Sequence, residues 1–145
     1  MLTVDEALDR ILAEARPLPG IATTLDESLG RVLAESLTSD IDSPPHDKSM
    51  VDGYAVKISD VDQEDVDLQV NEEITAGQVP TREVTAGTAS RVMTGAPVPV
   101  GTEAVVMVEQ TEQVESDSGQ RVKMIRQHLN PGAHIMARGT SIRHG

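Results

Sequence analysis

Residues 43–56 carry the side chains best suited to chemistry. The segment reads SPPHDKSMVDGYAV, and its ionisable side chains are His46, Asp47, Lys48 and Asp52. Its two prolines impose an extended backbone at the start. Gly53 follows Asp52 at once and permits backbone conformations that other residues avoid. A rigid loop that presents an acid, a base and a hydroxyl would need this mixture, whereas a solvated turn or a core strand would not.

Asp52 is the first candidate catalytic residue, and two roles are open to it. Its carboxylate could accept a proton, bind a hard cation or hydrogen-bond a substrate. It could also accept N–H bonds from its own turn, which is the commonest task of aspartate in such loops. Lys48 and Ser49, in the same segment, could contact an oxyanion or could simply be solvated.

A second candidate segment is residues 93–99, MTGAPVP. The hydroxyl of Thr94 could donate to an anion, while Gly95 would let backbone N–H groups approach the same ligand closely. The alternative is a threonine that caps a tight turn. The residues alone do not separate these two interpretations.

The last part of the chain, residues 118–145, is basic and has no acidic residue. Its bases are Arg121, Lys123, Arg126, Arg138 and Arg143. Such a region could hold an anion, or it could match an acidic part of a longer chain. Arg138 is the candidate anion contact, because a guanidinium offers a planar fork of donors to phosphate.

Composition excludes several classes of protein. The chain has 24 acidic and 12 basic residues and a formal net charge of −12, which argues against a nucleic-acid partner. No apolar run reaches the ~18 residues of a membrane-spanning helix, so no membrane partner is expected. The absence of cysteine excludes disulfides and cysteine nucleophiles, and it suits a reducing cytoplasm.

No metal site built by this chain alone is expected. The acidic run at residues 60–67 fails the pattern of an EF-hand, because Asp65 stands where glycine belongs and Asn71 where glutamate belongs. The histidines lack the HxxxH and HExxH spacings of zinc sites. A solvated acidic turn is the preferred interpretation of the run.

The N-terminal residues predict helices. Thr3 and Glu6 form the pattern of a capping box, and an apolar stripe at helical spacing follows as far as Ala15. Two prolines should end this helix near Arg16. Residues 24–33 repeat the capping pattern and the stripe, and they predict a second, short helix that contains an unfavourable glycine.

After Pro45 the pattern changes to short segments rich in β-branched residues. The expected strands are 54–58, 67–74, 89–93, 104–108 and 121–125. The turn at residues 116–119 predicts a hairpin between Val114 and Val122. The chain is therefore expected to be mainly β with N-terminal α-helices. We divide it into a helical arm (1–44), a β-rich body (45–129) and a basic segment (130–145).

Four stretches taken together carry a family resemblance. They are SPPHDKSMVDGYAV, MTGAPVP, EAVVMVEQTE and PGAHIMARGTSIRHG. In order and spacing they resemble the N-terminal region of the molybdopterin molybdenumtransferases, the gephyrin-type enzymes that insert molybdenum into the pterin dithiolene of the molybdenum cofactor. The resemblance covers nearly the whole chain, and the joint occurrence of the motifs makes it specific.

The resemblance implies a fold and an activity. The fold is a body of curved, bifurcated β-sheets, with N-terminal helices that help to form an elongated homodimer. The activity is a Mg²⁺-dependent cytoplasmic reaction that takes the anions molybdate and adenylylated molybdopterin and releases AMP. The chain is too short for the whole enzyme, so a missing α/β domain is expected to hold most of the substrate site and the Mg²⁺. The fragment should be inactive alone.

The resemblance also assigns site residues. It places Asp52 and Thr94 at catalytic positions. The substrate-binding positions it implies are Lys48, Ser49, Gly53, Gly95, Arg138 and Ser141. The chain departs from the family at Thr140-Ser141, where the family typically carries an acidic pair, so Ser141 cannot take a charged role. This departure keeps open a non-catalytic dimerisation or scaffold module from the same family. An unrelated small-ligand β-domain would require the motif matches to be coincidental.

Overall fold

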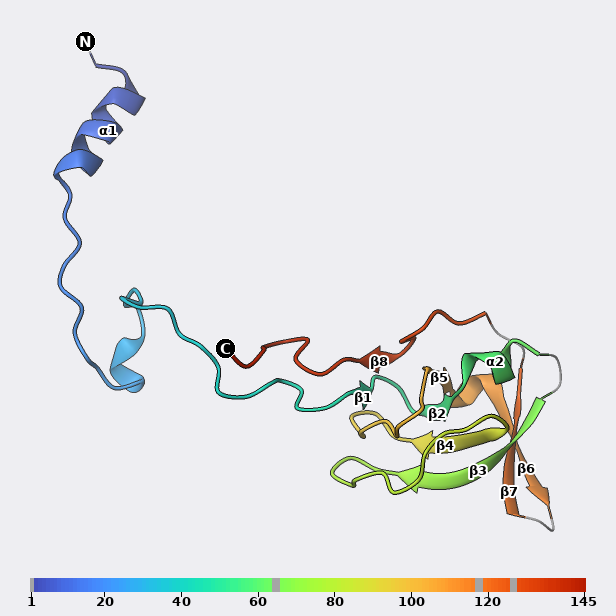
Figure 1. Cartoon of the computed structure of the whole chain (residues 1–145). Helices are drawn as coiled ribbons and strands as arrows, with labels where there is room; N and C mark the ends of the chain where they lie inside the picture. Colours follow the sequence, from blue (N-terminus) through green and yellow to red (C-terminus); the bar gives the residue numbers. More distant parts are fainter. Residues whose placement is uncertain (1, 64–65, 117–118, 126–127) are drawn as a thin grey trace. The chain divides into compact units, whose positions relative to one another are not determined.

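The computed structural model of the protein describes residues 2–63, 66–116, 119–125 and 128–145. The chain forms two compact units, residues 1–37 and 38–145 (Figure 1). The division falls after Leu37, whereas the sequence placed it at residue 44. No helix in the described part of the chain is both long and apolar enough to cross a membrane.

The first unit begins with the predicted helix. α1 spans Val4–Glu14, and its capping box is confirmed. The backbone N–H of Thr3 donates to the Glu6 carboxylate at 2.8 Å, and the N–H of Glu6 donates to the Thr3 hydroxyl at 3.3 Å. These bonds satisfy backbone donors that the first helical turn leaves free. The helix ends at Glu14, because Ala15 is already extended.

The second predicted helix is wrong. Only a 3₁₀ turn forms there, η1 at Asp26–Ser28, and it has no side-chain cap. Gly30 adopts a positive φ of 80°, which ends any helical path. A short helix needs packing to stabilise it. The apolar stripe has none in this structure, since Leu29 and Val32 are each 93% exposed.

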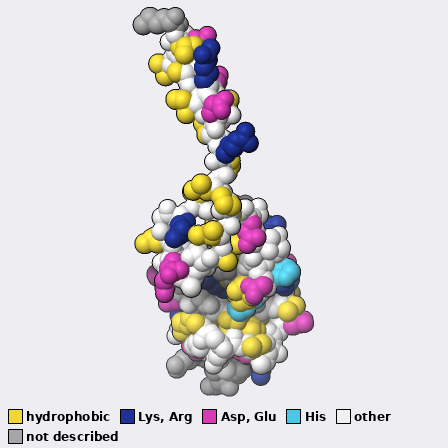
Figure 2. Space-filling view, turned by 90° about the vertical axis from the view of Figure 1, so that its left-hand side faces the viewer, with side chains coloured by type: hydrophobic (Ala, Val, Ile, Leu, Met, Phe, Trp, Pro, Cys, Tyr) yellow, Lys and Arg dark blue, Asp and Glu magenta, His cyan; other side chains and the backbone are white. Residues whose placement is uncertain are grey.

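The apolar side chains of the first unit are exposed. Figure 2 shows them at the surface of the N-terminal part, among charged side chains. None of the residues of α1 is buried. The most exposed large ones are Val4, Ile11, Leu12, Leu18, Ile21, Leu25, Leu29, Val32, Leu33 and Leu37.

The second unit is built on a curved six-stranded sheet with the order β5-β2-β4-β3-β7-β6 (Figure 1). All neighbours are antiparallel except β3 and β4, which are parallel. The fold is therefore mainly β, as predicted. The strands are β2 (Gly53–Val56), β3 (Val66–Ile74), β4 (Thr88–Val92), β5 (Ala104–Met107), β6 (Thr111–Ser116) and β7 (Gly119–Met124).

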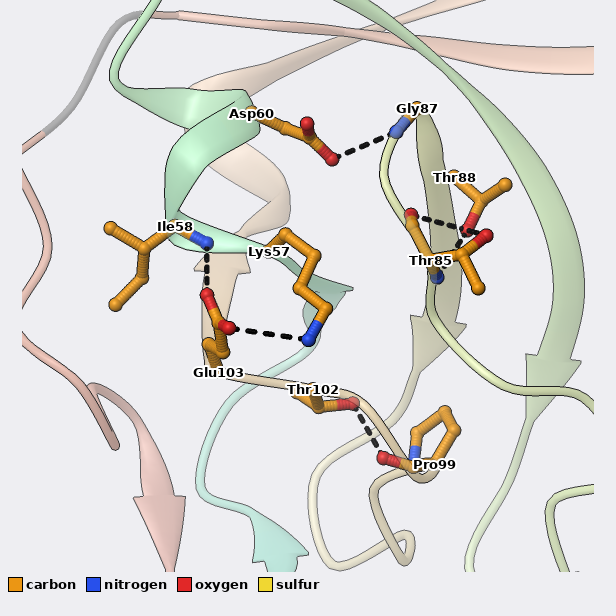
Figure 3. Close-up of polar contacts among 9 residues, drawn as sticks. All are labelled: Lys57, Ile58, Asp60, Thr85, Gly87, Thr88, Pro99, Thr102 and Glu103. Carbon is orange, nitrogen blue, oxygen red and sulfur yellow. Dashed lines mark hydrogen bonds and ion pairs between the residues drawn. The ribbon is translucent and has the colours of Figure 1, made fainter.

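The predicted strands are found with shifted ends. The hairpin is confirmed by the antiparallel pairing of β6 with β7, which runs to Ser116 opposite Gly119; its turn residues 117 and 118 lie outside the described residues. The strand predicted at 54–58 ends early, because Ile58 begins a short helix, α2 (Ile58–Val61). The Glu103 carboxylate accepts the N–H of Ile58 at 2.9 Å and pairs with Lys57 at 3.2 Å (Figure 3). A carboxylate on a free N–H at a helix start favours the turn.

The core is aliphatic apart from one ring. Tyr54 is fully buried, and its hydroxyl accepts a hydrogen bond from the side-chain amide of Gln113 at 3.2 Å. One cluster comprises Tyr54, Val56, Val61, Leu68, Ala89, Val106, Val122 and Met124. The other comprises Ala55, Ile74, Val84, Val92, Ala96 and Val105. Strands β2 and β5 contribute to both clusters, and β2 therefore fixes the start of the Asp52 loop against the core.

The expected solvated acidic turn is wrong for its first residue, because Asp60 is buried. Asp60, on α2, accepts the N–H of Gly87 at 3.0 Å (Figure 3). Asp62 contacts the ring of His128 at 2.7 Å. Residues 64 and 65 of the same run lie outside the described residues. In the described ranges, no three His, Cys, Asp or Glu side chains gather as a metal site.

Residues 38–49 and 135–145 lie side by side (Figure 1). A two-stranded sheet pairs β1 (Lys48–Ser49) with β8 (Ile135–Met136). Further out, Ser43 pairs with Ile142 and Ser39 with His144. We call this pair of segments the ribbon. It places the predicted basic segment in the same unit as the sheet.

Candidate functional site

The Asp52 loop is held between two other loops. The N–H of Ser49 donates to the carbonyl of Ala96 at 2.9 Å, and the N–H of Gly95 donates back to the carbonyl of Ser49 at 2.9 Å. On the other side, the N–H of Met50 donates to the carbonyl of His134 at 2.8 Å. Backbone bonds of this kind position a loop without using its side chains. They bring three of the motif stretches together, because His134 belongs to the stretch at residues 131–145.

Asp52 and Thr94 are in direct contact. The Oδ1 atom of Asp52 accepts the N–H of Thr94 at 2.6 Å and the Thr94 hydroxyl at 2.8 Å. Among the described residues, none donates to Oδ2. The Thr94 N–H is the largest cause that holds the pKa of Asp52 below its usual range, followed by the Thr94 hydroxyl and by the charge of Arg91. Asp52 is therefore an ionised, exposed carboxylate with one oxygen fixed and one available.

Gly95 shapes the Thr94 turn. The N–H of Ala96 donates to the carbonyl of Met93 at 3.0 Å, and Gly95 has a φ of 83°. This is the pattern of a turn whose third residue needs positive φ, which glycine supplies. Thr94 therefore belongs to a tight turn, as one of the two interpretations expected, and its hydroxyl donates to the Asp52 carboxylate.

Lys48 and Ser49 lie on β1, and their side chains differ in setting. Ser49 is 1% exposed, and its hydroxyl donates to the carbonyl of Val51 at 2.6 Å. That hydroxyl is occupied within the loop. Lys48 is half-buried, and within the described ranges no carboxylate pairs with its ammonium. Lys48 is consequently the residue of the two that can offer charge to a ligand.

Arg138 lies in a different cluster from Asp52 and Thr94. Its Nε donates to the Asp42 carboxylate at 2.6 Å, its Nη2 pairs with the same oxygen, and its backbone N–H donates to the Asp47 carboxylate at 2.7 Å. It lines a surface cleft of about 410 Å³ with His46, Asp47 and residues 98–102. Asp52 and Thr94 do not line this cleft. Arg138 thus lies at the edge of a cleft, with the charge of its guanidinium partly offset by Asp42.

Ser141 lies just beyond the turn that Gly139 makes with a φ of 68°. Its N–H donates to the carbonyl of Ser43 at 2.9 Å, which fixes its backbone in the ribbon. The side chain is exposed and uncharged. The structure places no described carboxylate among the contacts of Ser141.

Two residues near these sites were missed by the sequence reasoning. Asp42 links the two segments of the ribbon, because its Oδ1 accepts the N–H of His144 at 2.9 Å and its Oδ2 accepts a hydrogen bond from the Nε of Arg138. Arg91 acts on Asp52 from β4. A signal for Arg91 was present, because it is the single charged residue in a strand of otherwise small or apolar residues, TASRV. Asp42 carried no such signal.

The Asp42 contacts predict acid-sensitive closure of the ribbon. The N–H of His144, and then Arg138, hold the pKa of Asp42 below its usual range. A lowered folded pKa gives stabilisation that is complete above the unfolded pKa and is lost as pH falls through the folded value. At pH values below the range in which aspartates ordinarily titrate, we expect the NMR resonances of the His144 amide and the Arg138 Nε–H to shift, because both groups lose their hydrogen bonds to the Asp42 carboxylate. The Asp42→Asn variant should show the same shifted resonances at neutral pH. A spectrum like that of the parent chain would contradict this role of Asp42.

The family comparison decides the relationship. Residues 2–145 match the family described as MoeA N-terminal region (domain I and II). The chain belongs to this family. MoeA N-terminal regions are found in molybdopterin molybdenumtransferases, and the resemblance seen in the motifs is confirmed.

Curated and solved relatives agree. Molybdopterin molybdenumtransferase 2 of Mycobacterium tuberculosis is 42% identical over 106 residues, which are 70% of this chain and 25% of that protein. The molybdopterin molybdenumtransferase of Staphylococcus aureus is 35% identical over 118 residues, 79% of this chain and 28% of that protein. A molybdopterin biosynthesis MoeA structure from Pyrococcus horikoshii superimposes with a TM-score of 0.72 at 32% identity, covering 99% of this chain and 37% of that one. The chain spans little more than a quarter of the curated relatives.

Proposed function

We propose that this chain is the N-terminal part of a molybdopterin molybdenumtransferase and supplies the Asp52–Thr94 pair to its active site. The observation that supports this most is the pair itself. Two motifs far apart in the sequence meet at one carboxylate, which keeps an oxygen open to solvent. The relatives that carry this activity are about four times longer than the matched segment. The rest of the active site is therefore proposed to lie outside this chain.

The proposed reaction joins molybdate to adenylylated molybdopterin and releases AMP. Both substrates are anions, so basic groups and backbone donors must hold them together. The Lys48 ammonium offers charge beside the Asp52 loop. The open Asp52 oxygen can accept a hydrogen bond or a proton from a bound substrate or water, because Thr94 fixes the other oxygen. An ionised carboxylate cannot itself bind an oxyanion, so Asp52 is proposed to orient a donor.

The described residues do not form a Mg²⁺ site of their own. Asp52 offers one open carboxylate oxygen, and proteins usually hold Mg²⁺ by one or two carboxylates together with waters and substrate phosphates. Mg²⁺ would offset the phosphate charge of the substrate, and we propose that the remainder of the enzyme holds it. The proposed location of the reaction is the cytoplasm.

A chimera tests the proposal. Residues 1–145 of this chain would replace the corresponding region of the Mycobacterium tuberculosis relative, and AMP release from adenylylated molybdopterin would be measured with molybdate present. We expect the chimera to release AMP and the 145-residue chain alone to release none. An inactive chimera that folds as the parent enzyme does would contradict the transferase proposal.

The alternative function is a scaffold module that has lost the chemistry. Thr140-Ser141 favours it, because two uncharged residues stand where the family typically carries acids. The same chimera distinguishes the two proposals when it carries Thr140→Glu and Ser141→Asp. Activity that appears only with both acids restored would favour the scaffold, whereas activity without them favours the enzyme.

We also propose that residues 1–37 form a homodimer. Apolar side chains on α1 and after it are exposed in the single chain, and burying such a surface is favourable at about 25 cal/mol per Å². We expect the full chain to be dimeric and a chain starting at Thr38 to be monomeric. Light scattering after gel filtration measures this. A dimeric truncated chain would contradict the role given to the arm.

A further inference from the structure

Arg91 is a charged side chain in the sheet that the proposed chemistry does not use. It lies on β4, opposite Tyr54 of β2, and is half-buried. Its Nη1 donates to the carbonyl of Gly53 at 3.0 Å and to the carbonyl of Val92 at 3.4 Å. Its Cζ lies over the ring of Tyr54, 5.2 Å from the centroid. A guanidinium at this distance is attracted to the face of the ring.

These contacts lie where the Asp52–Thr94 pair is built. The pairing of β2 with β4 ends at Gly53 opposite Val92. Asp52 is the residue before Gly53, and Thr94 follows Val92 by two positions. Arg91 therefore binds the backbone on both strands at the last paired position before the site. Just beyond that position, the hydrogen bonds from Thr94 to the Asp52 carboxylate connect the same two segments of the chain.

Arg91 also acts on Asp52 through its charge. The groups that act on this carboxylate within the described residues are Thr94, which does not titrate near neutral pH, and Arg91. The contribution of Arg91 to the lowered pKa of Asp52 is smaller than that of either Thr94 hydrogen bond. It has the sign needed to offset a carboxylate that would otherwise repel an anionic substrate.

We propose that Arg91 is a positioning residue for the Asp52–Thr94 site. Through Gly53 and Tyr54 it fixes the direction of the Asp52 carboxylate toward Thr94. Its charge reduces the repulsion between that carboxylate and an anion, and this second part rests on the proposed function. A purely structural arginine would change only the stability of the sheet. A positioning arginine changes the properties of Asp52 and Thr94 in a chain that remains folded.

NMR of the 145-residue chain tests this without any assay of activity. The variants are Arg91→Met, which removes charge and donors, and Arg91→Lys, which keeps the charge without the planar fork. Arg82→Met is the matched control, because it removes one positive charge from the loop between β3 and β4, where, among the described residues, the Arg82 backbone N–H donates to Glu72 and its charge acts on the same carboxylate. The two readouts are the titration of the Asp52 carboxyl and the hydrogen exchange of the Thr94 amide.

We expect Arg91→Met to move the Asp52 titration midpoint to higher pH, because a nearby positive charge is lost. The Thr94 amide should exchange on the order of five- to seventyfold faster, the range for losing a partly exposed cation–π contact and the hydrogen bond to the carbonyl of Gly53. Arg91→Lys should leave the midpoint near that of the parent chain and still speed the exchange. Arg82→Met should change neither readout.

Two results would overturn the proposal. A folded Arg91→Met chain with both readouts unchanged overturns it. If Arg91→Met does not fold, Arg91→Lys decides, and unchanged Thr94 exchange in that variant overturns the proposal. Neither readout requires catalysis, so a failed chimera would contradict the transferase function and leave the positioning role standing.

Discussion

Replacing Gly53 with alanine is expected to destabilise the β body strongly. A methyl group built at this position would lie 2.1 Å from the carbonyl oxygen of Val106 and 2.9 Å from the side chain of Val105. The nearest atom is backbone of the adjacent strand β5, which cannot move without breaking its pairing with β2. Overpacking a core typically costs about 1–3 kcal/mol, and a contact with backbone should bring this variant to the upper end or above, a large share of the stability of a small domain.

Thermal unfolding followed by circular dichroism measures this effect. Gly77→Ala is the matched control, because Gly77 has a positive φ of 88° and no atom within 4 Å of the added methyl. That variant should lose only the ~1–2 kcal/mol of a residue forced into the left-handed region. Equal losses in the two variants would show that the strand contact at Gly53 is not tight.

Replacing Asp52 with asparagine is expected to lower AMP release by the chimera about 10²- to 10⁴-fold, the range for losing a positioned acid–base group. The amide keeps the shape of the carboxylate and an oxygen for Thr94. It loses the negative charge and the capacity to take a proton. The fall should appear in kcat, with the fold unchanged, if Asp52 acts on the bound substrate.

Asp67→Asn is the matched control for the Asp52 variant. Asp67 is an exposed aspartate on β3. Its removal changes the net charge by the same amount as the Asp52 variant, and we expect parent-like AMP release. An active Asp52→Asn enzyme would leave the pair with a structural role alone, and the Thr94 hydrogen bonds would then be the reason for the motif.

The elements that local patterns specify could be predicted from the sequence. The capping box of α1 depends on residues three positions apart, and the β6–β7 hairpin depends on a turn between two adjacent strands. Both require only neighbours in the chain. The second helix was predicted in the same way and does not form, because Leu29 and Val32 have no packing partner in this structure. Periodicity shows which face could be buried and does not show whether anything covers it.

The contacts of the candidate site are between residues far apart in the sequence, which local patterns do not predict. The contact between Asp52 and Thr94 connects residues 42 positions apart, and only the family resemblance placed both in one site. The resemblance placed Arg138 there as well, yet the structure pairs it with Asp42, which is 96 positions away. Neither the spacing of residues nor the composition indicates which charged side chains so far apart in the sequence will pair. Burial of the Ser49 hydroxyl likewise depends on the Met93–Ala96 turn packing against β1.

The ribbon has a consequence for how the body connects to its surroundings. The N–H of Gly145 donates to the carbonyl of Ser39 at 3.0 Å, so the two ends of the second unit, residues 38–145, lie next to each other. The sheet is connected at one side to the two paired segments of the ribbon. A body connected in this way can be exchanged between homologous proteins at two positions of the chain that lie side by side.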